Sequence, residues 1–231
     1  MKHIAKKRQY IILTLLTLLI ALIPLGDGEI YGSEGDWLNQ HVAAAETLRQ
    51  TMLERETLFP QYVSVGGGSN AYDLAYYGLF RPDVMASCLM PGVEMKYIIS
   101  FYSLICAAAA VNLCFSWLRR KGMSDFSAFM GAAVMASAAC FFHFHRQIMF
   151  VNYMPFLILA LIAIDEFLKR GKTLLLTASI FLICVQSFFY APTCLIVLLI
   201  YYLLGTDEND DINIIRPRNA GRAAPAAGLG I

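Results

Sequence analysis

Charged residues are scarce in this 231-residue chain. They make up 15% of it, while hydrophobic residues make up 58%. An ordinary soluble domain has about 25% charged residues, so the composition argues against a water-soluble globule. The formal net charge of +1 leaves no basic surplus to neutralise the phosphates of a nucleic acid. These two shortages indicate an integral membrane protein whose partners include the lipid bilayer and exclude nucleic acid.

Motifs that hold metals or nucleotides are also lacking. The sequence contains no CxxC, no HExxH and no Cys/His cluster, so no metal site is predicted. The run Gly66-Gly67-Gly68-Ser69-Asn70 lacks the Lys-Ser/Thr of a Walker loop and the spacing of a dinucleotide loop. We interpret this run as a turn. Cys88 is the only cysteine in a polar segment, so no disulfide framework is predicted there.

In place of charged residues and motifs, the sequence contains long uncharged stretches. Four of them contain 18 to 22 residues, close to the roughly 20 residues with which a helix crosses a bilayer. A fifth contains 34, and we divide it at Tyr190-Ala191-Pro192 because proline disfavours helix at the preceding residue. The prediction is an all-α integral membrane protein with about six transmembrane helices, at residues 9–26, 97–118, 126–145, 147–164, 173–189 and 191–205.

The basic residues predict how these spans are oriented. Thirteen of the 18 fall in the N-terminus (1–8), after the second and fourth spans, or in residues 206–231, and five fall on the other side. The positive-inside rule therefore predicts a multi-pass protein with both termini in the cytoplasm. An alternative is that residues 1–25 form a cleaved signal peptide, although no clear small-x-small cleavage site follows Leu25. Residues 206–231 are predicted to be a disordered tail.

One connection is much longer than the others, the extracytoplasmic loop at residues 27–96 between the first and second spans. It holds ten acidic residues, and we expect the chemistry of the protein to lie in it. Asn39 to Leu58 has helical composition, and Pro60 is expected to end that helix.

Asp36 is the first candidate for a catalytic residue. Partial desolvation at the membrane surface would make its carboxylate a better general base, and the alternative is that Asp36 is the N-cap of the following helix. Gln40 lies four residues later and shares its helix face. Gln40 and His41 would bind a substrate hydroxyl or phosphate, or would be no more than a solvated helix start.

Arg146 is a candidate for binding a lipid-linked phosphate. Its planar guanidinium group is suited to bidentate contacts with phosphate oxygens. Arg146 has a second interpretation, as an interfacial anchor that reaches the lipid headgroups. Asn152 and Gln186 lie within predicted spans, where buried amides usually bond across helices, so we assign them no catalytic role.

The order of several short motifs resembles that of the YfhO-type family of bacterial multi-spanning membrane proteins, relatives of the GT-C glycosyltransferases. The resemblance runs from about residue 8 to residue 205. Members of the family are several times longer, so the resemblance implies that this chain corresponds to their N-terminal part. The motifs are Gly35-Asp36 through Gln40, Gly66-Gly67-Gly68-Ser69-Asn70, Tyr76-Tyr77-Gly78-Leu79-Phe80-Arg81-Pro82, Met154-Pro155-Phe156-Leu157 and Ser187-Phe188-Phe189-Tyr190.

The resemblance implies a GT-C-like fold in the bacterial cytoplasmic membrane. It also implies transfer of a sugar from a polyprenyl-phosphate carrier to an extracytoplasmic acceptor such as a teichoic-acid-type polymer. Asp36 matches the catalytic base, which would deprotonate the acceptor hydroxyl. A cationic side chain or a divalent cation would stabilise the leaving phosphate. The residues expected to bind substrate are Gln40, His41, Asn70, Arg81 and Arg146.

Two other functions remain open at this point. A non-enzymatic membrane assembly factor would use the long loop as a docking surface. A transporter or lipid flippase would account for the broken helix at Pro192, but the mid-membrane ionisable residues and internal repeats of such proteins are absent from the sequence.

Overall fold

The computed structural model describes residues 2–22, 35–138 and 149–207. Its larger helices are α1 (Lys2–Leu22), α4 (Met95–Arg120), α5 (Asp125–Ala136), α7 (Met154–Arg170), α8 (Leu174–Gln186) and α9 (Ala191–Asp207). Between α1 and α4 lie the shorter elements, which we call the interhelical module (residues 35–94). They are the π-helix η1 (Trp37–Val42), α2 (Ala43–Glu54), β1 (Tyr62–Val63), β2 (Ser69–Asn70), the 3₁₀ helix η2 (Ala71–Tyr77) and α3 (Pro82–Ser87).

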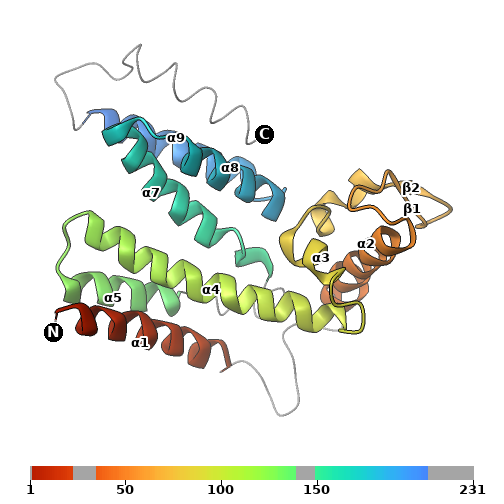
Figure 1. The fold of residues 1–231 in the computed structure, drawn as a ribbon, viewed down its shortest axis with the longest axis horizontal. Coiled ribbons are helices and arrows are strands. Elements are labelled where there is room, and N and C mark those ends of the chain that lie inside the picture. Colours follow the sequence, from red (N-terminus) through yellow and green to blue (C-terminus); the bar gives the residue numbers. More distant parts are fainter. Residues whose placement is uncertain (1, 23–34, 139–148, 208–231) are drawn as a thin grey trace.

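Helix α4 is central to the arrangement (Figure 1). Its first turn packs into the core of the interhelical module through Met95, Ile98 and Ile99. Its second half packs against α1 and α5 through Val111 and Phe115, while α7 packs on α4 and carries α8 and α9. The interhelical module therefore lies at the N-terminal end of α4, as Figure 1 shows.

Two helices in the described ranges are long and apolar enough to cross a bilayer. They are Met95–Arg120 and Met149–Arg170, the second of which includes the turn that precedes α7. Three shorter apolar helices correspond to α5, α8 and α9. The 12 residues of α5 would extend only about 18 Å, whereas the hydrocarbon core is about 30 Å thick. The fold is mostly helical with two candidate spans, as an all-α membrane protein requires.

Small residues allow neighbouring helices to approach closely. A Cβ atom on Gly131 of α5 would lie 2.7 Å from Cδ1 of Leu118 on α4, and one on Gly205 of α9 would lie 2.8 Å from Cδ1 of Leu168 on α7. A side chain at either position would require the facing leucine side chain to shift. Lipid tails are as apolar as hydrophobic side chains, so the hydrophobic effect does not drive helices together in a membrane. Helix pairs there depend on the close packing that small residues allow.

Polar side chains also connect the helices. Gln186 makes the expected bond between helices, whereas Asn152 does not. The Tyr102 hydroxyl on α4 donates to Oε1 of Gln186 on α8 at 2.8 Å, and Nδ2 of Asn112 donates to Thr14 on α1 at 2.8 Å. Asn152 is fully buried, yet neither of its amide atoms has a hydrogen-bond partner among the described residues. Asn152 lies in the turn before α7 rather than within a helix.

Two prolines in the described part of the C-terminal half begin helices. Pro155 and Pro192 are the second residues of α7 and α9, where the missing N–H would have no helical partner. The break between α8 and α9 begins earlier, at Ser187, which has the extended backbone angles φ −154° and ψ 99°. Proline therefore marks the restart of the helix after the break.

Two local features of the interhelical module differ from expectation. Helix α2 ends six residues before Pro60, because Glu56 takes a left-handed φ of 51° and local hydrogen bonds close the helix. These bonds run from Thr57 N–H to Met52 C=O and from Glu56 N–H to Leu53 C=O, which is the Schellman pattern. The Gly66–Gly68 turn joins β1 to β2 as a small antiparallel hairpin, so the fold is not purely helical.

Arg49 ties α2 to the segment that leads into α4. Its side chain is buried, and Nη1 donates to the backbone carbonyls of Val93 at 2.7 Å and Met90 at 3.4 Å. Its Nη2 pairs with Glu46 one turn earlier. A charged donor on two carbonyls makes stronger hydrogen bonds than a neutral one, so Arg49 fixes α2 against the segment that leads into α4.

Replacing Arg49 with methionine should lower the free energy of unfolding by about 2 kcal/mol, because the carbonyls of Met90 and Val93 lose their charged donor. Thermal unfolding of the detergent-solubilised chain should show a lower midpoint for Arg49→Met. The control is Arg55→Met, at an exposed arginine just after α2. Equal midpoints for the two variants would contradict this role.

Candidate functional site

Three of the predicted site residues lie on or beside η1, at the start of the interhelical module. Asp36 directly precedes this π-helix, and Gln40 and His41 belong to it. Short π-helical segments are rare and often occur at functional sites. Asp36 and Gln40 are exposed, whereas His41 is buried.

The carboxylate of Asp36 is held by a side-chain hydrogen bond. Nε2 of Gln40 donates to Oδ1 of Asp36 at 2.8 Å, and the Tyr77 hydroxyl donates to Oε1 of Gln40 at 3.1 Å. Asp36 occupies the N-cap position of the helix that follows, but its side chain makes no capping hydrogen bond there. The result is an exposed carboxylate oriented by an amide that is itself fixed by a tyrosine.

His41 lies among aromatic rings, and we call the set His41, Tyr76, Tyr77 and Phe150 the His41 cluster. The centroid of the imidazole lies 5.7 Å from that of Tyr76, 5.3 Å from that of Tyr77 and 5.3 Å from that of Phe150. His41 is 3% exposed, so it is no solvated helix start. Its Nδ1 has no hydrogen-bond partner in the described part of the chain.

The surroundings of His41 keep it neutral. Burial is the largest cause, the positive charge of Arg81 adds to it, and the negative charge of Asp36 opposes both. Together they lower the pKa of His41 to about 4. At neutral pH its imidazole is therefore an uncharged polar group in an aromatic setting rather than a cation for a phosphate.

Arg81 is buried in an ion pair that the sequence analysis did not anticipate. Nε and Nη2 of Arg81 donate to Oδ1 and Oδ2 of Asp83 at 2.7 and 2.8 Å, and the side chains are 5% and 0% exposed. Such bidentate pairing occupies the face with which an arginine would hold a phosphate. In this arrangement Arg81 acts on the site through its charge, by lowering the pKa of His41.

Asn70, a further predicted candidate, has a structural role. Asn70 is exposed, and its Oδ1 accepts from the backbone N–H of Tyr72 as the N-cap of η2. That capping bond is a structural role for Asn70. Arg146 lies outside the described residues.

Aromatic side chains extend the His41 cluster toward the other half of the molecule. Tyr76 lies 6.1 Å from Phe189, and Phe150 lies 6.1 Å from Tyr190, measured between ring centroids. Phe189 and Tyr190 belong to the break between α8 and α9. Tyr76 and Phe189 are 42% and 63% exposed, so the extended cluster has an open aromatic face. Motifs more than 100 residues apart in the sequence thus meet beside Asp36. The aromatic residues that both motifs contain were the only feature of the sequence that could have predicted this contact.

The described part of the site offers few donor atoms for a divalent cation. No group of three or more His, Cys, Asp or Glu side chains is close enough to hold a metal ion within the described ranges. Both oxygens of Asp83 accept from Arg81, which leaves Asp36 as the exposed carboxylate of the site. We therefore assign roles only to side chains of the described residues.

The fold and the site define a helical membrane protein with a carboxylate and an aromatic cluster on a module between two of its helices. Residues 9–216 match the family described as bacterial membrane protein YfhO, so the chain belongs to that family. No curated protein and no solved structure matches the chain.

Acid should destabilise the fold through His41. Because the pKa is about 4 when folded and 6.5 when unfolded, the unfolded chain binds more protons between these values and stability falls as the pH drops through them. Replacing His41 with phenylalanine removes this proton uptake. Thermal midpoints between about pH 7 and about pH 4 should fall less steeply for His41→Phe than for the unaltered chain. Parallel curves would contradict the assignment.

Proposed function

We propose that the chain acts as a GT-C-like glycosyltransferase in the bacterial cytoplasmic membrane. It transfers a sugar from a polyprenyl-phosphate carrier to an extracytoplasmic acceptor such as a teichoic-acid-type polymer. Membership of the YfhO family supports this reading. The observation that carries it is the exposed Asp36 carboxylate, which Gln40 and Tyr77 hold in place beside an open aromatic face.

Asp36 is the general base in this proposal. Its carboxylate takes the proton of the acceptor hydroxyl while the acceptor oxygen forms a bond to the anomeric carbon of the sugar. The bond between that carbon and the carrier phosphate breaks, and its electron pair leaves with the polyprenyl phosphate. Gln40 keeps Oδ1 occupied, so we assign Oδ2 as the atom that accepts the proton. Gln40 is a positioning residue.

The open aromatic face suits the lipid-linked donor. Exposed rings of Tyr76 and Phe189 offer apolar and π surface, on which both a sugar ring and an isoprenoid chain can pack. The buried, neutral His41 contacts Tyr76 of this face, and the buried Arg81–Asp83 pair adds no net charge to the site. The donor would approach from the bilayer at the break between α8 and α9.

The proposed topology has six spans, with the interhelical module outside and both termini in the cytoplasm. The distribution of basic residues supports it, and the module lies at the end of α4 opposite Arg119 and Arg120.

Cysteine labelling tests this topology. In intact cells a membrane-impermeant maleimide should label Arg55→Cys in the module and should not label Lys172→Cys between α7 and α8. Both positions are exposed, so accessibility to reagent depends on the side of the membrane. The unaltered chain gives the background from its own cysteines. Labelling of Lys172→Cys without permeabilisation would contradict the orientation.

Asp36→Asn should reduce sugar transfer by at least about 100-fold, since the amide cannot accept the proton. The measurement is transfer from a polyprenyl-phosphate-linked sugar to a teichoic-acid acceptor by the chain in proteoliposomes. Asn keeps an oxygen that accepts from Gln40, so folding should be unchanged. Asp73→Asn, at an exposed carboxylate of η2, is the matched control and should retain activity. Undiminished transfer by Asp36→Asn would refute the proposed base.

A further inference from the structure

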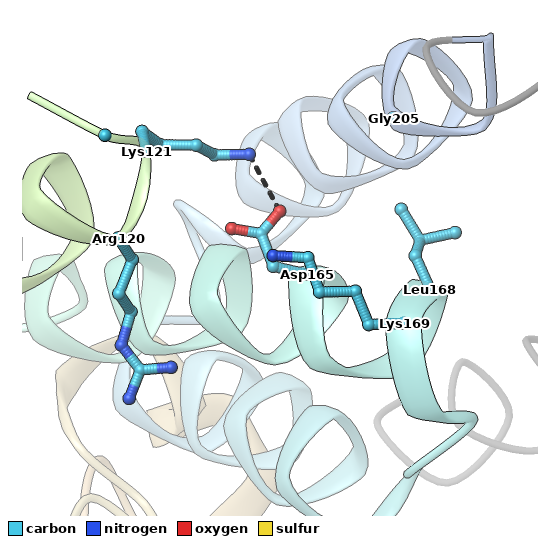
Figure 2. Close-up of a pocket in the computed structure, with 7 residues that line it drawn as sticks. Arg120, Lys121, Asp165, Leu168, Lys169 and Gly205 are labelled. Carbon is cyan, nitrogen blue, oxygen red and sulfur yellow. Dashed lines mark hydrogen bonds and ion pairs between the residues drawn. The ribbon is translucent and has the colours of Figure 1, made fainter.

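A second polar site lies at the opposite end of α4 from the His41 cluster. A pocket of about 360 Å³ opens there between α4, α7 and α9, within the range of roughly 300–1,000 Å³ that is usual for ligand pockets. Figure 2 shows the side chains around it. They include Arg120, Lys121, Asp165, Leu168, Lys169 and Gly205.

The charge of the lining is predominantly positive. Three of these side chains are cations, and Asp165 is the only carboxylate among the residues that line the pocket. Nζ of Lys121 donates to Oδ1 of Asp165 at 2.9 Å, as the dashed line in Figure 2 shows. Lys169 is exposed and has no hydrogen bond or ion pair within the described ranges. The pocket therefore carries a cation that no side chain described here compensates.

The positions of the pocket's charges are set by a network across three helices. The Tyr201 hydroxyl of α9 also donates to Oδ1 of Asp165 at 2.9 Å, and Nε1 of Trp117 on α4 donates to that hydroxyl at 3.3 Å. Nζ of Lys121 lies 4.9 Å from the centre of the Tyr201 ring. Oδ1 of Asp165 thus accepts from both Lys121 and Tyr201, and Lys121 is held at the edge of the pocket.

The place of the pocket points to the headgroup region of a bilayer. Both of the long candidate spans, Met95–Arg120 and Met149–Arg170, end beside it. The ends of a span lie at the level of the lipid headgroups. Leu168 and Gly205 add an apolar side to the lining, and a Cβ at position 205 would collide with Leu168. The pocket therefore combines cations with an apolar wall where a phospholipid presents a phosphate and the start of its acyl chains.

We propose that this pocket binds the phosphate of an anionic phospholipid headgroup. Lys169 and Lys121 contact the phosphate oxygens, and Leu168 contacts the glycerol end of the acyl chains. Basic pockets between membrane helices bind anionic headgroups in this way. A soluble phosphate compound shares the phosphate chemistry but would make no use of the apolar wall or of the position at the ends of two spans.

Lipid retention by the purified full chain tests the proposal. Native mass spectra would be recorded with phosphatidylglycerol, with phosphatidylcholine, and with phosphatidylglycerol in the presence of inorganic phosphate. Loss of one lysine contact should weaken phosphatidylglycerol binding by Lys169→Gln about fivefold. The matched control is Lys172→Gln, an equal loss of charge at an exposed residue outside the pocket, and it should bind phosphatidylglycerol like the unaltered chain.

Each possible result either supports or overturns the assignment of this pocket to an anionic phospholipid. Weaker phosphatidylglycerol binding by Lys169→Gln alone, with little binding of phosphatidylcholine, supports it. Equal binding by Lys169→Gln and Lys172→Gln, or equal retention of the two lipids, would overturn it. Displacement of phosphatidylglycerol by a comparable concentration of inorganic phosphate would overturn the lipid assignment in favour of a soluble phosphate compound. None of these results depends on glycosyltransferase activity.

Discussion

The packing of α4 against α7 is the contact on which the rest of the structure depends. The fully buried Ala110 packs there with Ile158 and Ile162, while α1 and α5 attach to α4 and α8 and α9 attach to α7. In a bilayer the hydrophobic effect does not favour helix over lipid, so close packing and interhelical hydrogen bonds must hold such a contact. The small side chain at position 110 permits the approach, and Tyr102 with Gln186 adds a polar link between α4 and α8.

This contact also assembles the proposed active site. The interhelical module is fixed to the first turn of α4 by Met95, Ile98 and Ile99, whereas Phe150 and Phe189 come from the chain around α7, α8 and α9. Only when α4 and α7 are packed do the rings from the two halves meet beside His41 and Tyr76. The site thus combines a local element, the Asp36–Gln40 pair, with a surface that requires the whole bundle.

The length of α4 separates two sites of different character. Its 26 residues extend about 39 Å, which places the Asp36 carboxylate and its aromatic face at one end and the lysine-lined pocket at the other. A neutral imidazole and an internally paired arginine make the first site suited to base chemistry on an uncharged hydroxyl. The Lys169 ammonium, which forms no ion pair in the described part of the chain, makes the second site suited to binding an anion. The two proposals therefore concern independent ends of one helical bundle.

The sequence by itself determined the membrane class and the Asp36–Gln40 pairing, because uncharged runs and helical spacing are local properties of the chain. The order of its short motifs pointed to the family. It did not reveal the partner of Arg81, the burial of His41 or the end of α2 before Pro60, since each depends on backbone angles or neighbours that carry no periodic pattern. The contact of Tyr76 with Phe189, and the pocket that Lys121, Asp165 and Gly205 share, were decided only by the tertiary structure. These residues are far apart in the sequence, and which faces of α4, α7 and α9 meet is set by side-chain shape rather than by hydropathy.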